Sequence, residues 1–329
     1  MVEEVSDKAE VRQSSSSLFS AAASFRRPAL TVMVLGAAAV IVVIARHTLA
    51  KSLHVLATAS PGWLLLALAA EAASLTAFGM SRTLLLRAGG HRIGLGPVMA
   101  ITYAAYALGL SIPFAGAELD VVYSYRQFRR AGLDAATTSW SMAVSWICST
   151  ASLALLLVAG AMRFDRMRAL LQSVLEKLAA LSKRAFGKPE DGGAGVDRFL
   201  DEVSSRRLSL PGYGRVFGLA FANWAFDCAT LALSIRAMGQ PVPWDDLLLV
   251  YGAGAAVAST GLTPGGFALV ELAMTAALTA SGLHSSAALA AVVAYRFISF
   301  WLVLLGGWVA FIVLAHPLRR RLSRGSPGR

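Results

Sequence analysis

Ser259-Thr-Gly-Leu-Thr-Pro-Gly-Gly-Phe-Ala-Leu-Val-Glu271 separates two apolar runs in the C-terminal part of the chain. Pro264 lacks an N–H and restricts the preceding residue to extended backbone, and Gly265 and Gly266 have low helix propensity. A helix that begins near residue 246 should therefore end here, and a second helix can begin at once because proline fits a first turn. Inside a membrane, such a break leaves backbone polar groups that are tolerated only when buried in protein or beside a wet cavity. The break is therefore a candidate binding site.

The composition of the whole chain indicates a membrane protein. Of its 329 residues, 56% are hydrophobic and only 15% are charged, and the mean hydropathy is +0.61. Several apolar runs approach the roughly 20 residues that a bilayer crossing requires. The runs are residues 29–45, 61–81, 97–113, 138–162, 214–238, 246–262, 264–281 and 285–315. We predict an all-α, polytopic membrane helix bundle with about six to eight apolar helices, and with broken or re-entrant helices at 97–131 and 246–281.

The distribution of charge argues against nucleic-acid binding, and the positions of the cysteines and histidines argue against metal or redox chemistry. The net charge is +11, but the basic residues gather in loops and at the C-terminus, as the positive-inside rule and attraction to anionic lipid predict. Cys148 and Cys228 lie within apolar runs and have no zinc spacing, and the histidines are scattered. No hydrolase, zinc-protease or Walker motif is found. We therefore expect no cofactor, no metal and no enzyme activity.

The chain is expected to form a single membrane domain with short flanking segments. Residues 1–27 are polar and Ser-rich and predict a disordered tail, 28–315 form the membrane domain, and 316–329 form a basic tail. Within the domain, residues 163–213 predict a cytoplasmic connection with an amphipathic helix on the membrane surface, although a partner-protein interface remains an alternative. The C-terminus is expected to be cytoplasmic. The oligomeric state does not follow from the sequence.

Charged and amide side chains within the apolar runs are candidate site residues. A carboxylate at the centre of a membrane costs about 2.5–3.5 kcal/mol on insertion scales, so Glu71 should face the bundle. Asn223 and Asp227 share one helix face. Arg296 is too far from either helix end to reach water easily, so it needs an anionic partner, and we predict that this partner is Glu271.

These groups have two interpretations. Hydrogen bonds between helices and a structural ion pair would account for all of them. Alternatively, Arg296 and the first N–H groups after Pro264 bind a lipid phosphate, because the N-terminus of a half-helix is an anion site.

An earlier stretch has the same layout as the opening one. Pro113-Phe-Ala-Gly-Ala-Glu118-Leu-Asp120 also follows an apolar run, and its last acid follows its proline by seven residues, as Glu271 follows Pro264. Paired broken helices in an internal repeat are typical of transporter binding sites. We therefore expect an internal repeat, with chance similarity as the alternative. Pro113, Glu118 and Asp120 join the candidate site residues.

Together these residues carry a family resemblance. Thr263-Pro-Gly-Gly-Phe-Ala-Leu-Val-Glu271, followed by Gly282, Tyr295-Arg296-Phe297 and Gly306-Gly307, resembles the second signature of the lysylphosphatidylglycerol synthase transmembrane region family. That family includes the flippase portion of the multiple peptide resistance factor. Ile112-Pro113-Phe-Ala-Gly-Ala-Glu118 is similar to its first signature, and Asn223-Trp224 with Asp227 is similar to its middle helix. The resemblance covers about residues 28–315. Where the family often has Glu-Arg and a later Asp, this chain has Ser145-Trp146 and Ser149, so one buried charge cluster is missing.

The resemblance implies a bundle of broken helices that handles lipids across the bilayer, in the cell (plasma) membrane of a bacterium. It does not imply synthesis of an aminoacyl lipid, because the soluble acyltransferase domain of the bifunctional members does not follow this region. The leading hypothesis is a transporter or flippase for an anionic or glycosylated lipid, in which Arg296 and the amides near Gly265 and Gly266 hold the phosphate. The residues expected to balance charge or carry protons are Glu71, Asp227 and Glu271.

Two other functions remain open from the sequence. The protein could be a non-transporting accessory partner of a cell-envelope lipid or glycosyltransferase enzyme, with purely structural charges. It could also be an enzyme that acts on a lipid through Glu118 or Asp120.

Overall fold

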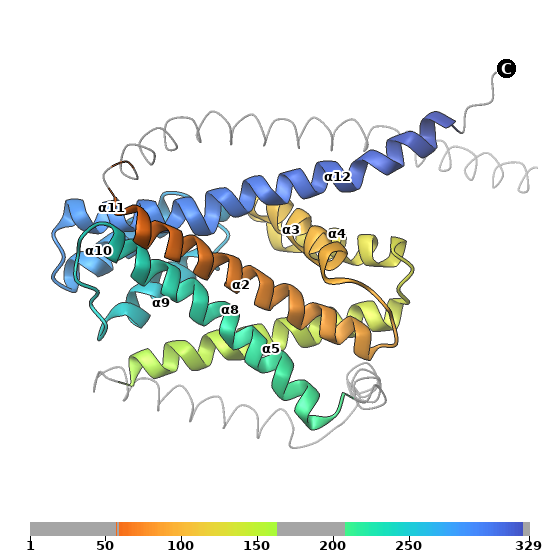
Figure 1. Cartoon of the computed structure of the whole chain (residues 1–329), viewed down its shortest axis with the longest axis horizontal. Coiled ribbons are helices and arrows are strands. Elements are labelled where there is room, and N and C mark those ends of the chain that lie inside the picture. The colour runs from red at the N-terminus through yellow and green to blue at the C-terminus, as the bar shows by residue number, and fades with distance from the viewer. Residues whose placement is uncertain (1–56, 58, 163–207, 325–329) are drawn as a thin grey trace, which may run out of the picture. The chain divides into compact units, whose positions relative to one another are not determined.

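The computed structural model describes residues 57, 59–162 and 208–324, with side chains up to residue 315, and every structural statement below refers to these residues. Their regular elements are all helices (Figure 1). The first group is α2 (Pro61–Ala88), α3 (Leu95–Ser111), α4 (Gly116–Arg130) and α5 (Ala135–Ala161). The second group is α8 (Leu210–Ala237), α9 (Leu247–Ala258), the 3-10 turn η1 (Pro264–Gly266), α10 (Leu269–Ala280), α11 (Ser285–Arg296), the π-helical segment η2 (Phe297–Leu302) and α12 (Val303–Arg324).

Several predictions for the chain ends and the long connection fall outside these residues. They are the tail at 1–27, the first apolar run at 29–45 and the amphipathic helix within 163–207. At the other end, α12 continues to Arg324, so the first part of the predicted basic tail is helical.

The helix lengths confirm a membrane bundle with broken helices. α2, α5, α8 and the continuous stretch Ser285–Ala315 are long and apolar enough to cross a membrane, whereas α3, α9 and Pro264–Ala280 are apolar but shorter. The 12 residues of α9 span only about 18 Å, well below the roughly 30 Å of a hydrocarbon core. The predicted breaks at 97–131 and 246–281 are therefore present, as the re-entrant hairpins α3–α4 and α9–α10.

The two groups of helices repeat one layout, which supports the predicted internal repeat. α2 and α8 each have 28 residues and begin after a serine, Ser60 and Ser209, with a proline in the first turn. Each helix is followed by a glycine with positive φ, Gly90 at 90° and Gly239 at 71°, where a side chain would be strained. In both groups a short helix, a break, a second short helix and a long helix follow.

α2 and α8 lie side by side and run in opposite directions (Figure 1). The Ser60 N–H donates to the Ala237 carbonyl over 2.8 Å, which joins the start of α2 to the end of α8. Midway along both helices, Ser74 Oγ donates to the Asn223 carbonyl over 2.9 Å and accepts from Asn223 Nδ2 over 2.8 Å. Ser74 and Asn223 are 149 residues apart, the offset that also separates Ser60 from Ser209. A residue that contacts its own repeat counterpart lies on the axis between the halves, so the halves are inverted relative to each other.

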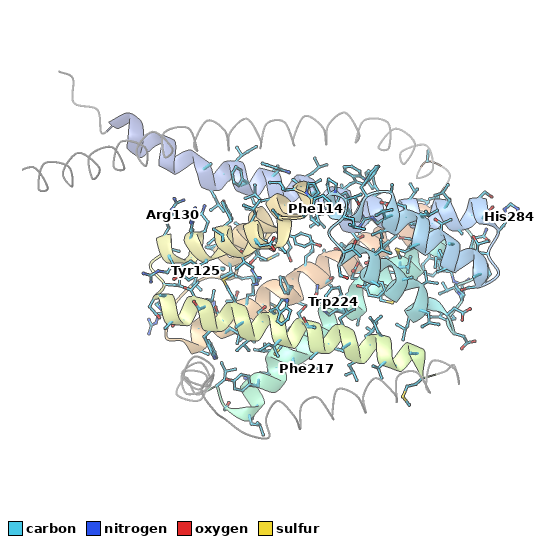
Figure 2. The ribbon with its side chains drawn as sticks, turned by 180° about the vertical axis from the view of Figure 1, so that it is seen from behind. Phe114, Tyr125, Arg130, Phe217, Trp224 and His284 are labelled. Carbon is cyan, nitrogen blue, oxygen red and sulfur yellow. The ribbon has the colours of Figure 1, made fainter. Side chains whose placement is uncertain are left out.

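The two re-entrant hairpins meet at their tips. The N–H of Phe114, between α3 and α4, donates to the carbonyl of Gly261, between α9 and η1, over 3.0 Å. Figure 2 shows Phe114 between Arg130, at the outer end of α4, and His284, in the turn after α10. The hairpins therefore approach each other from opposite ends of the helices that flank them, as in transporters with inverted repeats.

α5 runs parallel to α8, which bears on the long connection between them. Trp224 Nε1 donates to the Ser149 carbonyl over 2.9 Å, and Leu156 lies in one core cluster with residues of the second half of α8. Met162, after α5, and Leu208, before α8, therefore lie at opposite ends of these two helices. The predicted cytoplasmic connection at 163–213 stays a prediction, because most of it lies outside the described residues.

The core sits between the second hairpin and the long helices, and apolar side chains also cover the outside. Leu231, Met274 and Val292 are fully buried where α8, α10 and α11 pack together. On the outer surface, large apolar side chains such as Leu65 and Leu272 are exposed, as expected of residues that face lipid.

Single cysteines on the loops after α2 and α8 are expected to be labelled from opposite sides of the membrane, because these helices are antiparallel. Arg92 and Pro241 are exposed in those loops. In a background without Cys148 and Cys228, an impermeant maleimide added outside should label only one of the variants Arg92→Cys and Pro241→Cys, and permeabilisation should expose the other. Labelling of both from the same side would contradict the inverted arrangement.

Candidate functional site

A buried arginine lies where the second hairpin meets the last long helix. Arg296, at the end of α11, is 9% exposed. Its Nε donates to Glu271 Oε1 over 2.8 Å, and its Nη2 donates to the Gly265 carbonyl over 2.8 Å. The Phe300 ring covers one face of the guanidinium, with Cζ 4.2 Å from the ring centre, which adds a cation–π contact. The ion pair predicted from the sequence is therefore present.

The backbone of the break is used differently from the prediction. Pro264 to Gly266 form one 3-10 turn in which Gly265 and Gly266 have positive φ angles of 56° and 71°, and α10 begins only after it. The Gly266 N–H donates to the Thr263 carbonyl over 3.0 Å, while Gly265 gives its carbonyl to Arg296. The Gly266 N–H, which the prediction assigns to a phosphate, is used within the turn in this structure. Two successive glycines at positive φ turn the chain, so no helix continues directly from the proline.

A π-helical turn directly after Arg296 holds the arginine in place. Such turns are rare and are frequently found at functional sites, and this one spans Phe297–Leu302. It places the Phe300 ring against both the guanidinium and Gly265, and a Cβ on this glycine would overlap the ring. The Trp301 ring packs edge-on against the Phe300 ring, with the ring centres 4.9 Å apart. The guanidinium is thus oriented by the fold alone.

A second polar group joins α2 and α8 beside this arginine. The side chains of Glu71 and Asp227 share a hydrogen bond. Because an ionised carboxylate can only accept, one of the two must carry a proton. Asp227 also accepts from the hydroxyls of Tyr251, over 2.6 Å, and Tyr295, over 3.1 Å. Three donors favour Asp227 as the ionised member. Since Tyr295 precedes Arg296 in α11, the acid pair and the ion pair form one polar cluster.

Asn223 has a different role from its neighbour Asp227. Its contacts with Ser74 join α2 to α8, and the adjacent Trp224 donates its indole N–H to Ser149 on α5. Figure 2 shows Trp224 where α5 and α8 cross. Such bonds between membrane helices contribute about 0.6 kcal/mol each. Asn223 therefore serves helix packing.

The candidates from the first break do not join the cluster. Glu118 and Pro113 are exposed. Asp120 is half-buried, accepts from Ser124 Oγ over 3.1 Å and interacts electrostatically with Arg82 of α2. The first break therefore has its own acid and its own arginine. This arginine comes from α2, whereas the arginine of the second break comes from α11.

Arg82 is a half-buried cation that the sequence analysis missed. It follows directly after the apolar run predicted at 61–81, whereas α2 continues to Ala88. Its Nη1 donates to Thr102 Oγ1 over 3.3 Å, and its Cζ lies 4.8 Å from the centre of the Phe78 ring. A sequence signal existed, because the apolar residues 84–86 follow Arg82 before the first glycine.

Unused hydrogen-bonding atoms remain around the ion pair. Glu271 Oε2 and the hydroxyl of Thr275, one turn along α10, are buried and have no partner among the described residues. Arg296 donates hydrogen bonds through its Nε and one Nη2 hydrogen, and its Nη1 has no partner among the described residues. A ligand could therefore bind this guanidinium without breaking either existing bond.

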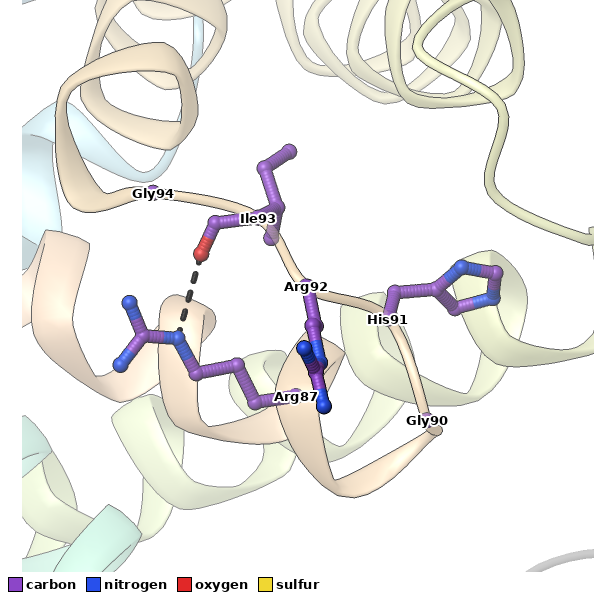
Figure 3. Close-up of a pocket in the computed structure, with 6 residues that line it drawn as sticks. All are labelled: Arg87, Gly90, His91, Arg92, Ile93 and Gly94. Atoms are coloured by element: carbon purple, nitrogen blue, oxygen red, sulfur yellow. Dashed lines mark hydrogen bonds between the residues drawn. The ribbon is translucent and has the colours of Figure 1, made fainter.

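A shallow basic hollow of about 480 Å³ lies elsewhere, on the loop between α2 and α3 (Figure 3). Arg87 Nε donates there to the Ile93 carbonyl over 3.1 Å, and His91 Nε2 lies 2.7 Å from Asp134 Oδ2. Arg92 also lines the hollow. The Arg87 and His91 side chains already bind the protein, and none of the membrane-buried charges lines the hollow. We assign it to the basic surface of the protein.

Comparison with known proteins supports the family resemblance most directly in the second half of the chain. The family model described as "Lysylphosphatidylglycerol synthase TM region" matches residues 145–307. This range contains Asp227, Glu271 and Arg296. It is shorter than the range expected from the resemblance and does not include the first break. No curated protein matches the chain.

Proposed function

Because the chain belongs to the lysylphosphatidylglycerol synthase transmembrane region family, a membrane domain associated with lipid handling, we propose that it binds an anionic or glycosylated lipid by its phosphate and moves it between the leaflets. Multi-pass membrane residence and lipid handling follow from the family and the helices, while translocation is our proposal. The observation that carries it is the buried Arg296, with unused donors beside the tips of two inverted hairpins.

The chemistry of Arg296 suits a phosphate. A guanidinium presents N–H groups in a planar fork that matches two phosphate oxygens, and Nη1 with the second hydrogen of Nη2 forms such a fork here. α10 starts beside it, and the N-terminal end of a helix favours negative charge. Both features would bind the shared part of many lipids, so the remainder of the headgroup need not be recognised at this point.

The arrangement of the hairpins supports movement across the membrane. The tip contact between Phe114 and Gly261 lies between hairpins that come from opposite ends of the flanking helices. Non-helical backbone at membrane depth is tolerated where it is buried in protein or lines a wet cavity. A phosphate held there would be between the two leaflets.

The distribution of charge suggests the orientation. Basic residues gather at the end of the bundle where α2 and α4 finish and α8 begins, namely Arg87, Arg92, Arg126, Arg129, Arg130 and Arg215. At the opposite end, Arg236 is accompanied by Asp245 and Asp246. Leu314 of α12 packs near Leu86 at the basic end. By the positive-inside rule, we propose that this end and the C-terminus are cytoplasmic, in the plasma membrane of a bacterium.

The test is lipid translocation in liposomes that contain the purified protein. Fluorescent phosphatidylglycerol should change leaflets faster than in empty vesicles. The double variant Arg296→Gln/Glu271→Gln, which removes both charges together, should lose this acceleration. Arg236→Gln, the same substitution at an exposed arginine, is the matched control and should retain it.

Two outcomes would contradict the proposal. Retained acceleration in the folded double variant would remove Arg296 from the transport site. No acceleration by folded wild-type protein with anionic or glycosylated lipids, together with stoichiometric copurification of a cell-envelope lipid or glycosyltransferase enzyme, would favour an accessory role.

A further inference from the structure

We infer that binding of a lipid phosphate at Arg296 is coupled to the uptake of one proton by Glu271. This inference rests on the proposed lipid binding and adds the proton as a co-substrate. It concerns only the charge of the site, and it can fail while lipid binding itself is confirmed.

The first step of the argument is the charge of the empty site. Arg296 and Glu271 form an ion pair whose side chains are only 10% and 16% exposed, so the pair is neutral and largely removed from water. A phosphate diester brings one further negative charge. It can displace Glu271 from Nε, or it can bind the unused Nη1 and Nη2 hydrogens beside it. In both cases one cation then faces two anions.

An uncompensated charge in such surroundings is unfavourable, because the attraction of a single partner does not replace the lost hydration of two anions. Protonation of one carboxylate removes this cost, and the loaded site is then as neutral as the empty one. The step is a simple acid–base reaction. The Glu271 carboxylate takes a proton from the aqueous phase and becomes a carboxylic acid, with no other bond formed or broken.

The contacts of Glu271 make it the acceptor. Its Oε2 has no hydrogen-bond partner in the described part of the chain, so a proton on this atom breaks no existing bond. The hydroxyl of Thr275 lies one turn along α10, is also buried and also lacks a partner there. The carboxylic acid of protonated Glu271 has an O–H that can donate a hydrogen bond to this hydroxyl.

The other titratable groups around the site are already committed. Asp227 of α8 accepts from Tyr251 of α9 and Tyr295 of α11 and shares a proton with Glu71 of α2. The phenol of Tyr106 on α3 also interacts with the charge of Arg296, but a phenol is neutral at ordinary pH and cannot take up a proton. Among these groups, Glu271 is the carboxylate that has an oxygen without a hydrogen-bond partner and whose cation, Arg296, the phosphate would bind.

The coupling predicts a specific pH dependence. If one proton enters with each lipid, the affinity for the lipid should rise as the pH falls, by up to about tenfold per pH unit. A gradient of protons across the membrane would then bias the direction in which the lipid moves.

Calorimetric titration of the purified full-length protein with short-chain phosphatidylglycerol tests this directly. Titrations at one pH in two buffers with different ionisation enthalpies give the number of protons taken up per lipid. We expect about one proton for the wild type and none for Glu271→Gln. This variant should also bind the lipid at least as tightly, because no carboxylate competes for Arg296. Glu118→Gln, the same substitution at an exposed carboxyl outside the polar cluster, should still take up about one proton.

The possible failures are distinguishable. Lipid binding by the wild type without proton uptake would overturn this inference and leave the proposed function intact. Uptake that persists in Glu271→Gln would overturn Glu271 as the acceptor. Absence of lipid binding by the wild type at any pH would overturn the proposed function and this inference with it. If Glu271→Gln does not fold, the proton count of the wild type and its retention in Glu271→Asp decide the question.

Discussion

Replacing Arg296 with glutamine is expected to destabilise the folded protein by about 3–5 kcal/mol, because the substitution leaves the Glu271 carboxylate buried without its cation. Glu271→Gln should have a cost of similar size, since it leaves the guanidinium with only a carbonyl and an aromatic ring. The double variant Arg296→Gln/Glu271→Gln should recover most of the loss, because two neutral amides carry no uncompensated charge and can bind each other. Denaturant unfolding in detergent, followed by tryptophan fluorescence, measures all four proteins.

The double-mutant cycle gives the coupling between the two side chains, and the exposed Arg236→Gln controls for the loss of an arginine as such. Losses that simply add would show that the pair is not coupled and that the short distances do not reflect a stabilising ion pair. The destabilisation caused by Arg296→Gln should also become smaller as the pH falls, because protonation removes the charge of the unpaired, buried carboxylate.

Gly116→Ala is expected to separate the two helices of the first hairpin. A Cβ on Gly116 would overlap the backbone carbonyl of Gly109 on α3, and a backbone atom cannot rotate away as a side chain can. Overpacking of a core usually costs about 1–3 kcal/mol, and the upper end or beyond is expected here because one helix must shift. Because α4 then moves away from α3, the tip contact between Phe114 and Gly261 should be lost as well.

Thermal unfolding in detergent, together with the translocation assay, measures this effect. Gly96→Ala is the matched control, because a Cβ at this position of α3 meets nothing within 4 Å. It should leave stability unchanged or raise it slightly, since alanine has the higher helix propensity. Equal stability of Gly116→Ala and Gly96→Ala would show that the close approach of α3 and α4 is not needed for folding.

The features that follow from local chemistry could be predicted from the sequence. The break at Pro264 depends on the backbone of proline and two glycines, and the pairing of Arg296 with Glu271 depends on the cost of an isolated charge in hydrocarbon. Both arguments need only neighbouring residues and a general property of membranes. The same holds for the membrane class and for the short helices on either side of each break.

The features that depend on distant helices could not be predicted in the same way. Glu71 and Asp227 meet because α2 and α8 are antiparallel, with Ser74 opposite Asn223, and nothing near either acid encodes that register. Arg82 was missed because apolar composition alone ended the helix too early. Glu118 and Asp120 differ in exposure because residues two apart on a helix point in different directions. α4 is turned so that Glu118 is exposed while Asp120 is half-buried.

The axis through Ser74 and Asn223 implies a second shape for the same chain. If each hairpin adopted the surroundings that its counterpart has now, a site open toward one leaflet would become open toward the other without any new kind of contact. The two shapes would not have equal energy. Arg296 follows the positive-φ Gly282 by 14 residues, and the residue 14 after the corresponding Gly132 is Trp146, whose side chain is 71% exposed. The preference of the empty protein for one side of the membrane is therefore set by how far the halves have diverged, and swapping diverged residues between them is a way to reverse it.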